Sequence, residues 1–145
     1  MSFEVRSGPW SADQARAHLA EACIPVRLAS SGTFPLVQSL WFLFEDDALW
    51  CATQVDAVVT RRLQREPRCG FEVSADLPPY RGVRGTGIAT IEPTAATVVL
   101  PRLIERYVGD EPTPLSTWLL SRLDTEVAIR IGDLSITTWD YSGRM

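Results

Sequence analysis

Short strand-like segments separated by turn residues constrain the fold of this chain more than any other feature. Apolar and β-branched residues fill the segments, and Gly, Ser, Asp and Pro stand between them. The expected strands are 26–30, 35–44, 48–53, 69–74, 83–91, 126–131 and 134–139. Turns such as Glu45-Asp46-Asp47 and Gly132-Asp133 would join neighbouring strands as antiparallel hairpins. The pattern predicts a mainly β (α+β) fold whose antiparallel sheet closes, or nearly closes, into a barrel.

The run Leu40-Trp41-Phe42-Leu43-Phe44 is apolar on both faces of its expected strand. A barrel strand has this composition when one side faces the core and the other faces a partner. The run is too apolar to face water, so it predicts an interface with a second copy of the chain.

Helical segments are expected around this barrel. Ser11-Ala12-Asp13-Gln14 has the form of a capping box, which predicts a helix over 11–23, packed on the barrel and ending before Pro25. Asp56 could cap a second helix over 57–65. The further helices are 94–108, which Pro101 is expected to kink or divide, and 114–123.

Composition indicates one domain over 1–145. The net charge of −4 and the pI of about 5.0 argue against nonspecific binding to nucleic acid or anionic membrane. No apolar run approaches transmembrane length, and the N-terminus lacks a signal-peptide pattern. Cys23, Cys51 and Cys69 form no Cys-x-x-Cys pair, which fits buried free thiols in a reducing cytoplasm. With His18 as the single histidine, no metal site is expected.

Three features carry a family resemblance. They are the segment Pro79–Gly87, the strand and Arg-rich helix that precede it, and Trp139-Asp140-Tyr141 near the C-terminus. In this order they resemble the FMN-binding split-barrel family related to pyridoxamine 5′-phosphate oxidase. The resemblance implies a six-stranded antiparallel split β-barrel with peripheral helices. It also implies a homodimer that binds FMN or a deazaflavin between its subunits and acts as an oxidoreductase on a small organic substrate. No residue stands out as a general base, which is compatible with flavin chemistry because the cofactor transfers the hydride.

The resemblance also assigns site residues. The strand at Ser39, Leu40, Trp41 and Phe42 would run past the flavin ring. Thr53, Arg61 and Arg62 would hold the phosphate, Gly82 would offer its backbone, and Trp139 of the partner would cover the pocket. Simpler roles stay open for the same residues: Trp41, Phe42 and Trp139 as core or interface residues, and Arg61 and Arg62 on a solvated helix face.

The sequence departs from the family at the phosphate segment. The usual Ser-x-Lys pair falls on Ala57 and Val59, and Asp56 adds a negative charge nearby. The oxidase's Arg-x-His-Asp-Arg signature is also absent after Trp139, so true pyridoxamine 5′-phosphate oxidase activity is not expected. The alternative is a flavin-free split-barrel dimer that serves as a binding or interaction module.

Overall fold

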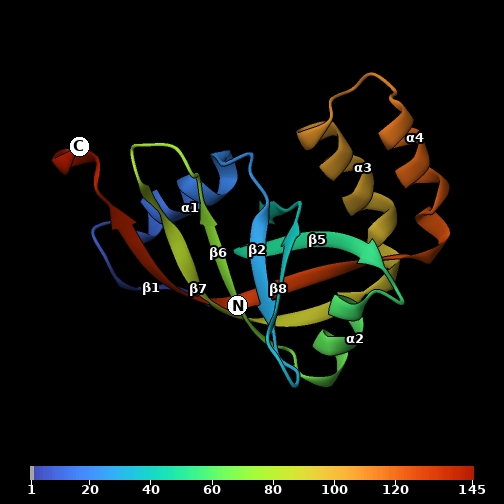
Figure 1. Ribbon diagram of the computed structural model, residues 1–145, viewed down its shortest axis with the longest axis horizontal. Coiled ribbons are helices and arrows are strands. Elements are labelled where there is room, and N and C mark those ends of the chain that lie inside the picture. Colours follow the sequence, from blue (N-terminus) through green and yellow to red (C-terminus); the bar gives the residue numbers. More distant parts are fainter. Residues whose placement is uncertain (1) are drawn as a thin grey trace.

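The computed structural model describes residues 2–145 and is built on one sheet of eight strands (Figure 1). The strands lie in the order β3-β2-β6-β7-β8-β5-β4, and β1 pairs in parallel with β8. All other pairs are antiparallel, as predicted. The strands are β1 (Phe3–Ser7), β2 (Val26–Ser30), β3 (Leu36–Leu40), β4 (Leu43–Glu45), β5 (Ala48–Gln54), β6 (Arg68–Ser74), β7 (Arg81–Glu92) and β8 (Glu126–Asp140).

The sheet is curled so that its two edges approach each other. β3 and β4 end the strand order on opposite sides, yet only Trp41 and Phe42 separate them in sequence. Leu40 and Leu43 can therefore be at most about 11 Å apart. A sheet whose edges meet without pairing is a split barrel, which confirms the predicted fold class.

Tyr107 accounts for the break between β3 and β4, which was predicted as one strand over 35–44. The Tyr107 hydroxyl accepts from the Phe42 backbone N–H (3.3 Å), and its single proton is shared between the carbonyl oxygens of Ile24 (2.9 Å) and Phe42 (3.3 Å). These bonds replace the ladder bonds that Phe42 would make inside a strand. The sheet of the described residues has eight strands where the resemblance implied six, and both this break and the N-terminal strand β1 contribute to the difference.

The C-terminal segment was predicted as two strands but forms one, because Gly132-Asp133 does not form a hairpin turn. β8 runs unbroken through these residues, and Asp133 adopts a positive φ of 49°. The register against β7 shifts at Gly87, where Thr86 faces Ser135 and Ile88 faces Gly132. β8 has one residue more than β7 between these two pairs, which makes a β-bulge in β8. Beyond the bulge, β8 stays paired with both β7 and β1.

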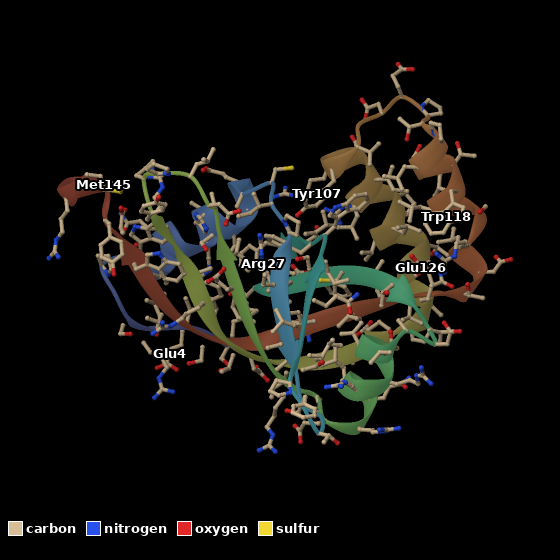
Figure 2. All side chains as sticks on the ribbon, viewed as in Figure 1. Glu4, Arg27, Tyr107, Trp118, Glu126 and Met145 are labelled. Atoms are coloured by element: carbon tan, nitrogen blue, oxygen red, sulfur yellow. The ribbon has the colours of Figure 1, made fainter. Side chains whose placement is uncertain are left out.

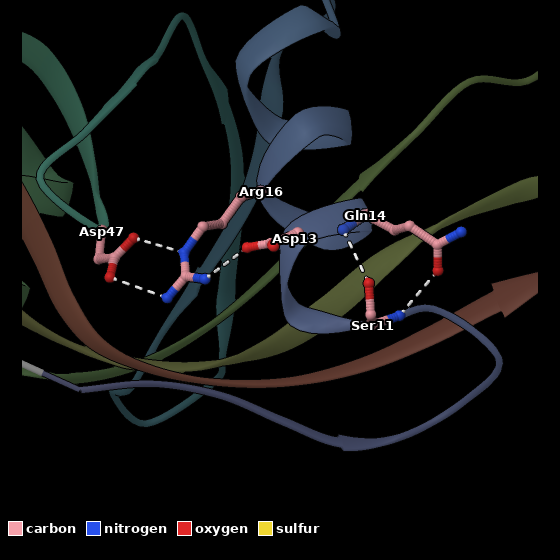
Figure 3. Close-up of polar contacts among 5 residues, drawn as sticks. All are labelled: Ser11, Asp13, Gln14, Arg16 and Asp47. Carbon is pink, nitrogen blue, oxygen red and sulfur yellow. Dashed lines mark hydrogen bonds and ion pairs between the residues drawn. The ribbon is translucent and has the colours of Figure 1, made fainter.

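Helix α1 (Ala12–Glu21) fastens the N-terminal segment onto the sheet, as expected (Figure 3). The predicted capping box is present: Ser11 Oγ accepts from the Gln14 N–H, and Gln14 Oε1 accepts from the Ser11 N–H. Arg16 binds both carboxylate oxygens of Asp47 in the β4–β5 turn (2.9 and 3.2 Å). That turn is the predicted hairpin, and both Asp46 and Asp47 have positive φ.

The other helices lie at the rim of the sheet. They are α2 (Val58–Arg65), α3 (Ala96–Tyr107), α4 (Pro114–Ser121) and the short 3₁₀ turns η1 (Pro93–Ala95), η2 (Leu123–Thr125) and η3 (Ser142–Arg144). The N-cap of α2 is Ala57 and makes no side-chain capping bond, so the predicted Asp56 cap is wrong. α3 continues through Pro101 and is not divided there. Figure 1 shows α3 and α4 side by side where β8 begins, with the C-terminus at the opposite end of that strand.

Two clusters of apolar side chains make the core. The larger lies inside the curl and includes Leu28, Phe42, Leu49, Ile129 and Ile136. The smaller packs α3 against the outer face of the sheet, and its buried members are Leu43, Val99, Leu103 and Ala128. The helix of the same chain therefore packs against Trp41 and Leu43 of the apolar run 40–44, a role that the sequence analysis gave to a partner.

The cysteines divide between core and surface. Burial raises the pKa of Cys51 to about 12 and that of Cys69 to about 11, so both stay protonated at neutral pH. Cys23 is exposed, so the expectation that all three thiols are buried is wrong for this residue.

Candidate functional site

The end of β3 forms one wall of a pocket of about 260 Å³. Ser39, Leu40 and Trp41, which the resemblance placed along a flavin ring, line it together. The opposite walls come from β5, the start of β8, α3 and α4, through Ala52, Glu126, Leu100, Leu103, Leu115 and Leu119. This apolar pocket is called the helix pocket below.

Among residues 2–145, Glu126 is the only charged side chain that lines the helix pocket. It is 8% exposed, and its Oε2 accepts a hydrogen bond from Gln54 Nε2 (2.7 Å). Burial raises the pKa of the Glu126 carboxyl, while the Gln54 bond and the charge of Arg122 act in the opposite direction. Figure 2 shows Glu126 beside the α3–α4 end of the sheet. Sequence reasoning missed this residue because a glutamate at the start of a strand is expected to be exposed to solvent.

Trp41 and Phe42 have different surroundings. Trp41 is half-buried and stacks on Tyr107, with ring centroids 5.2 Å apart and planes 4° apart. Phe42 is fully buried in the larger core cluster, and both its backbone polar groups are bonded to Tyr107. The structure therefore leaves Ser39, Leu40 and Trp41 accessible to a ligand and gives Phe42 a core position.

Gly82 and Trp139 lie together on β7 and β8, where they are paired in register. A Cβ atom added to Gly82 would lie 2.9 Å from Cζ2 of Trp139 and would also meet Ser74. The indole of the same chain therefore covers Gly82. Trp139 also lines a pocket of about 320 Å³ with Glu72, Arg84, Thr137 and Tyr141.

These two groups of predicted site residues lie at opposite ends of β8. Glu126 opens the strand beside the helix pocket, and Trp139 stands near its end. The intervening length of strand is on the order of 40 Å at about 3.3 Å per residue. Ser39, Leu40 and Trp41 on one side and Trp139 on the other line separate pockets that share no residue, so they do not form one site within the chain.

The fold is shared with solved structures of low sequence identity. A conserved hypothetical protein from Mycobacterium tuberculosis is 23% identical, with a TM-score of 0.77 over 97% of this chain and 91% of the other. An F420 reductase is 22% identical (TM-score 0.66; 81% and 92% covered). A putative pyridoxamine 5′-phosphate oxidase from Listeria innocua is 19% identical (TM-score 0.66; 87% and 95% covered). The chain has the split-barrel fold of the pyridoxamine 5′-phosphate oxidase-like proteins. No protein-family model matches the sequence, and no curated protein matches it significantly.

In this split barrel, the segment expected to hold a phosphate is apolar or already engaged. Ala57 packs against the core and Val59 is 1% exposed. Arg62 donates from Nη1 to the Phe34 carbonyl oxygen (2.7 Å), which ties α2 to the loop between β2 and β3. Arg61 is exposed on α2, and Thr53 is half-buried on β5 opposite Val127. Arg61 therefore remains available for a phosphate, whereas Arg62 has a structural role.

Two other arginines of the split barrel face one pocket on the outer side of the sheet. Arg6 and Arg84 line a pocket of about 610 Å³ together with four hydroxyl side chains, those of Ser7, Thr86, Ser135 and Thr137. Glu72 faces Arg84 across the strands, but within residues 2–145 neither Arg6 nor Arg84 forms an ion pair. Arg84 also lines the pocket of Trp139.

Two further classes of feature are missing from the part of the chain that the structure describes. Among residues 2–145, no three His, Cys, Asp or Glu side chains gather as metal ligands would. No helix in the same range has the length and apolar character needed to cross a membrane.

Proposed function

We propose that this protein binds a flavin-type cofactor, FMN or a deazaflavin, and acts as an oxidoreductase on a small organic substrate. The observation that carries the proposal is the accessible wall of Ser39, Leu40 and Trp41 along the helix pocket. An F420 reductase and an FAD-binding protein from Mesorhizobium loti share the fold and support a cofactor of this class. The cofactor would supply hydride transfer, and the protein would position it beside the substrate and limit the access of water.

A homodimer would complete the cofactor site. Trp139 does not line the helix pocket of its own chain, but a second subunit could place its Trp139 over the first subunit's pocket. The helix pocket alone is smaller than the 300–1,000 Å³ typical of ligand sites. Phe34, Val37 and Val58 are 79%, 66% and 52% exposed, and apolar surface of this kind favours association.

The cofactor phosphate would be held by arginines in place of the missing lysine. Arg84 and Arg6 are the stronger candidates because they carry no ion pair, stand beside hydroxyl groups and lie on the Trp139 side of the molecule. In a dimer they would reach a cofactor together with Trp139. Arg61 is the remaining candidate from the α2 segment. Guanidinium groups suit this role because their N–H groups match phosphate oxygens in pairs.

Titration with FMN and with riboflavin, followed by flavin fluorescence quenching, tests the proposal. Riboflavin carries the same ring without the phosphate. Micromolar FMN binding would support the proposal, and a comparison with riboflavin would isolate the phosphate contribution. Arg84→Gln should weaken FMN binding about ten-fold or more and leave riboflavin binding unchanged. Arg61→Gln is the matched variant. A larger loss of FMN affinity in Arg61→Gln than in Arg84→Gln would indicate that α2 holds the phosphate.

The second candidate function is a flavin-free binding or interaction module. The burial of Val59 and the engagement of Arg62 favour it, because both remove the phosphate contacts that the resemblance implied. A colourless protein that binds neither FMN nor a deazaflavin at hundreds of micromolar would exclude the oxidoreductase and leave this alternative.

A further inference from the structure

We propose that the helix pocket is a binding site for a small apolar amine, with the Glu126 carboxylate receiving the ammonium group of the ligand. The proposal rests on the proposed function only in identifying this amine as the substrate. Binding itself requires the pocket and the carboxylate, both of which belong to one chain.

The carboxylate of Glu126 retains hydrogen-bonding capacity. Within residues 2–145 its side chain accepts one hydrogen bond, from Gln54 to Oε2. An ionised carboxylate normally accepts several bonds, so Oε1 is left for a ligand. Gln54 is itself fixed by Arg122 and Thr125: its Nε2 donates to the Arg122 carbonyl oxygen, and its Oε1 accepts from the Thr125 hydroxyl. The orientation of the carboxylate is therefore held before any ligand arrives.

No protein cation neutralises this carboxylate directly. Glu126 belongs to none of the ion pairs formed within residues 2–145. The charge that acts on it is that of Arg122, whose guanidinium lies over the Trp118 ring at 4.5 Å from the centroid. A buried carboxylate without a close cation costs free energy, and a ligand ammonium group would offset that cost.

The remaining walls define the rest of the ligand. Leu100, Leu103, Leu115 and Leu119 supply apolar contacts, and no basic side chain of the described residues lines the pocket. An anion would be repelled by Glu126, and a strongly polar neutral molecule would lose its hydration against the leucines. The volume of about 260 Å³ limits the ligand to a small molecule. A single ammonium group on a compact apolar body fits all three conditions.

The test is an NMR titration of the flavin-free protein at pH 7.5 with phenethylamine and with 2-phenylethanol, which has the same carbon skeleton and no charge. Amide shifts of Ala52 and Leu119 would report occupation of the helix pocket. The amine should bind at least about ten-fold more tightly than the alcohol. Glu126→Gln should reduce amine binding to the level of the alcohol and leave alcohol binding unchanged. Glu105→Gln, which removes an exposed carboxylate from α3, should change neither.

A second variant keeps the test decisive if Glu126→Gln does not fold. Leu119→Trp fills the pocket while leaving Glu126 in the sequence, and it should abolish the binding of both probes. Equal affinity for amine and alcohol would overturn the proposal, as would no binding of either probe or amine binding that survives Glu126→Gln. These outcomes are separate from flavin binding: a protein that binds FMN but not the amine refutes only this inference. A protein that binds the amine but no flavin supports the site and refutes the oxidoreductase.

Discussion

At the scale of single residues, Tyr107 links three parts of the structure. Its hydroxyl bonds to the backbone of Ile24 and Phe42, and its ring stacks on Trp41. It thereby fixes the point where the two edges of the sheet meet and the position of a side chain that lines the helix pocket. One phenol group thus couples the closure of the barrel to the geometry of the candidate site.

Tyr107→Phe should lower the free energy of unfolding by about 1–3 kcal/mol, because it leaves part-buried backbone groups without a partner. Urea denaturation would measure the change. Tyr141→Phe is the control, since Tyr141 is 49% exposed and its hydroxyl makes no hydrogen bond within residues 2–145. Equal stability of the two variants would show that the Tyr107 hydroxyl does not hold the edges together.

His18 gives the protein a pH dependence that can be isolated, because it is the single histidine. Its Nε2 lies 3.0 Å from the Val73 carbonyl oxygen, and burial lowers its pKa. The Val73 carbonyl and Glu21 act to raise this pKa, and Arg81 acts to lower it. A depressed pKa means that the neutral ring is preferred in the folded state. The neutral His18 ring therefore stabilises the folded state above the unfolded-state pKa of about 6.5, and this stabilisation is lost as the pH falls through the folded-state pKa.

The corresponding experiment compares wild type with His18→Gln by urea unfolding at pH 7.5 and 5.5. The wild type should lose more stability on acidification than the variant, because only the wild type must protonate a part-buried ring. Parallel losses in the two proteins would show that His18 does not carry the effect.

At the scale of elements, the glycines of β7 serve the protein's own packing. Glycines inside a strand allow either a bulge or the close approach of a ligand to the backbone. Gly87 stands at the bulge against β8, and a Cβ atom there would lie 2.6 Å from Ile131 Cγ2. A side chain at Gly85 would collide with the Ser135 carbonyl oxygen. The close approach is therefore between neighbouring strands.

Gly85→Ala and Gly70→Ala form a matched pair that tests this role. Gly85→Ala should destabilise the protein by about 1–3 kcal/mol, because a backbone atom must move to admit the methyl group. Gly70→Ala adds a methyl group at ordinary contact distance, 3.7 Å from the Gly85 carbonyl oxygen. It should be neutral or stabilising by up to about 1 kcal/mol. Thermal or urea unfolding would rank the two, and a reversed order would contradict the packing argument.

At the scale of the whole molecule, the length of β8 determines how a cofactor site could be assembled. The strand separates the helix pocket from Trp139, so the proposed site needs one contribution from each of two chains. In a symmetric dimer the same arrangement would occur twice.

A subunit-mixing experiment tests that assembly. Trp41→Ala and Trp139→Ala should each lose flavin affinity as homodimers. When the two variants are unfolded together and refolded, about half of the dimers should be heterodimers. One of the two sites in each heterodimer joins an intact Trp41 to an intact Trp139, so the sample should recover about a quarter of all its flavin sites. Size-exclusion chromatography with light scattering would verify dimer formation. Heterodimers without recovery would place both tryptophans in the same subunit's site or in none.

The sequence predicted several features whose signal is local. The capping box at Ser11 and Gln14, the hairpin at Asp46-Asp47 and an antiparallel barrel were predicted from neighbouring residues and from the order of strands, and the family resemblance added that the barrel is split. The same local reasoning failed at Gly132-Asp133, where turn residues form a bulge, and at Asp56, which caps no helix.

Only the tertiary structure decided the features that join distant segments. The break at Phe42 depends on Tyr107, 65 residues away, and the buried setting of Glu126 depends on leucines from α3 and α4. The sequence determined which elements form, because turn chemistry, capping and apolar alternation act over a few residues. It could not determine which side chains meet, because burial and the resulting pKa of Glu126 arise from the packing of elements that are far apart in the chain.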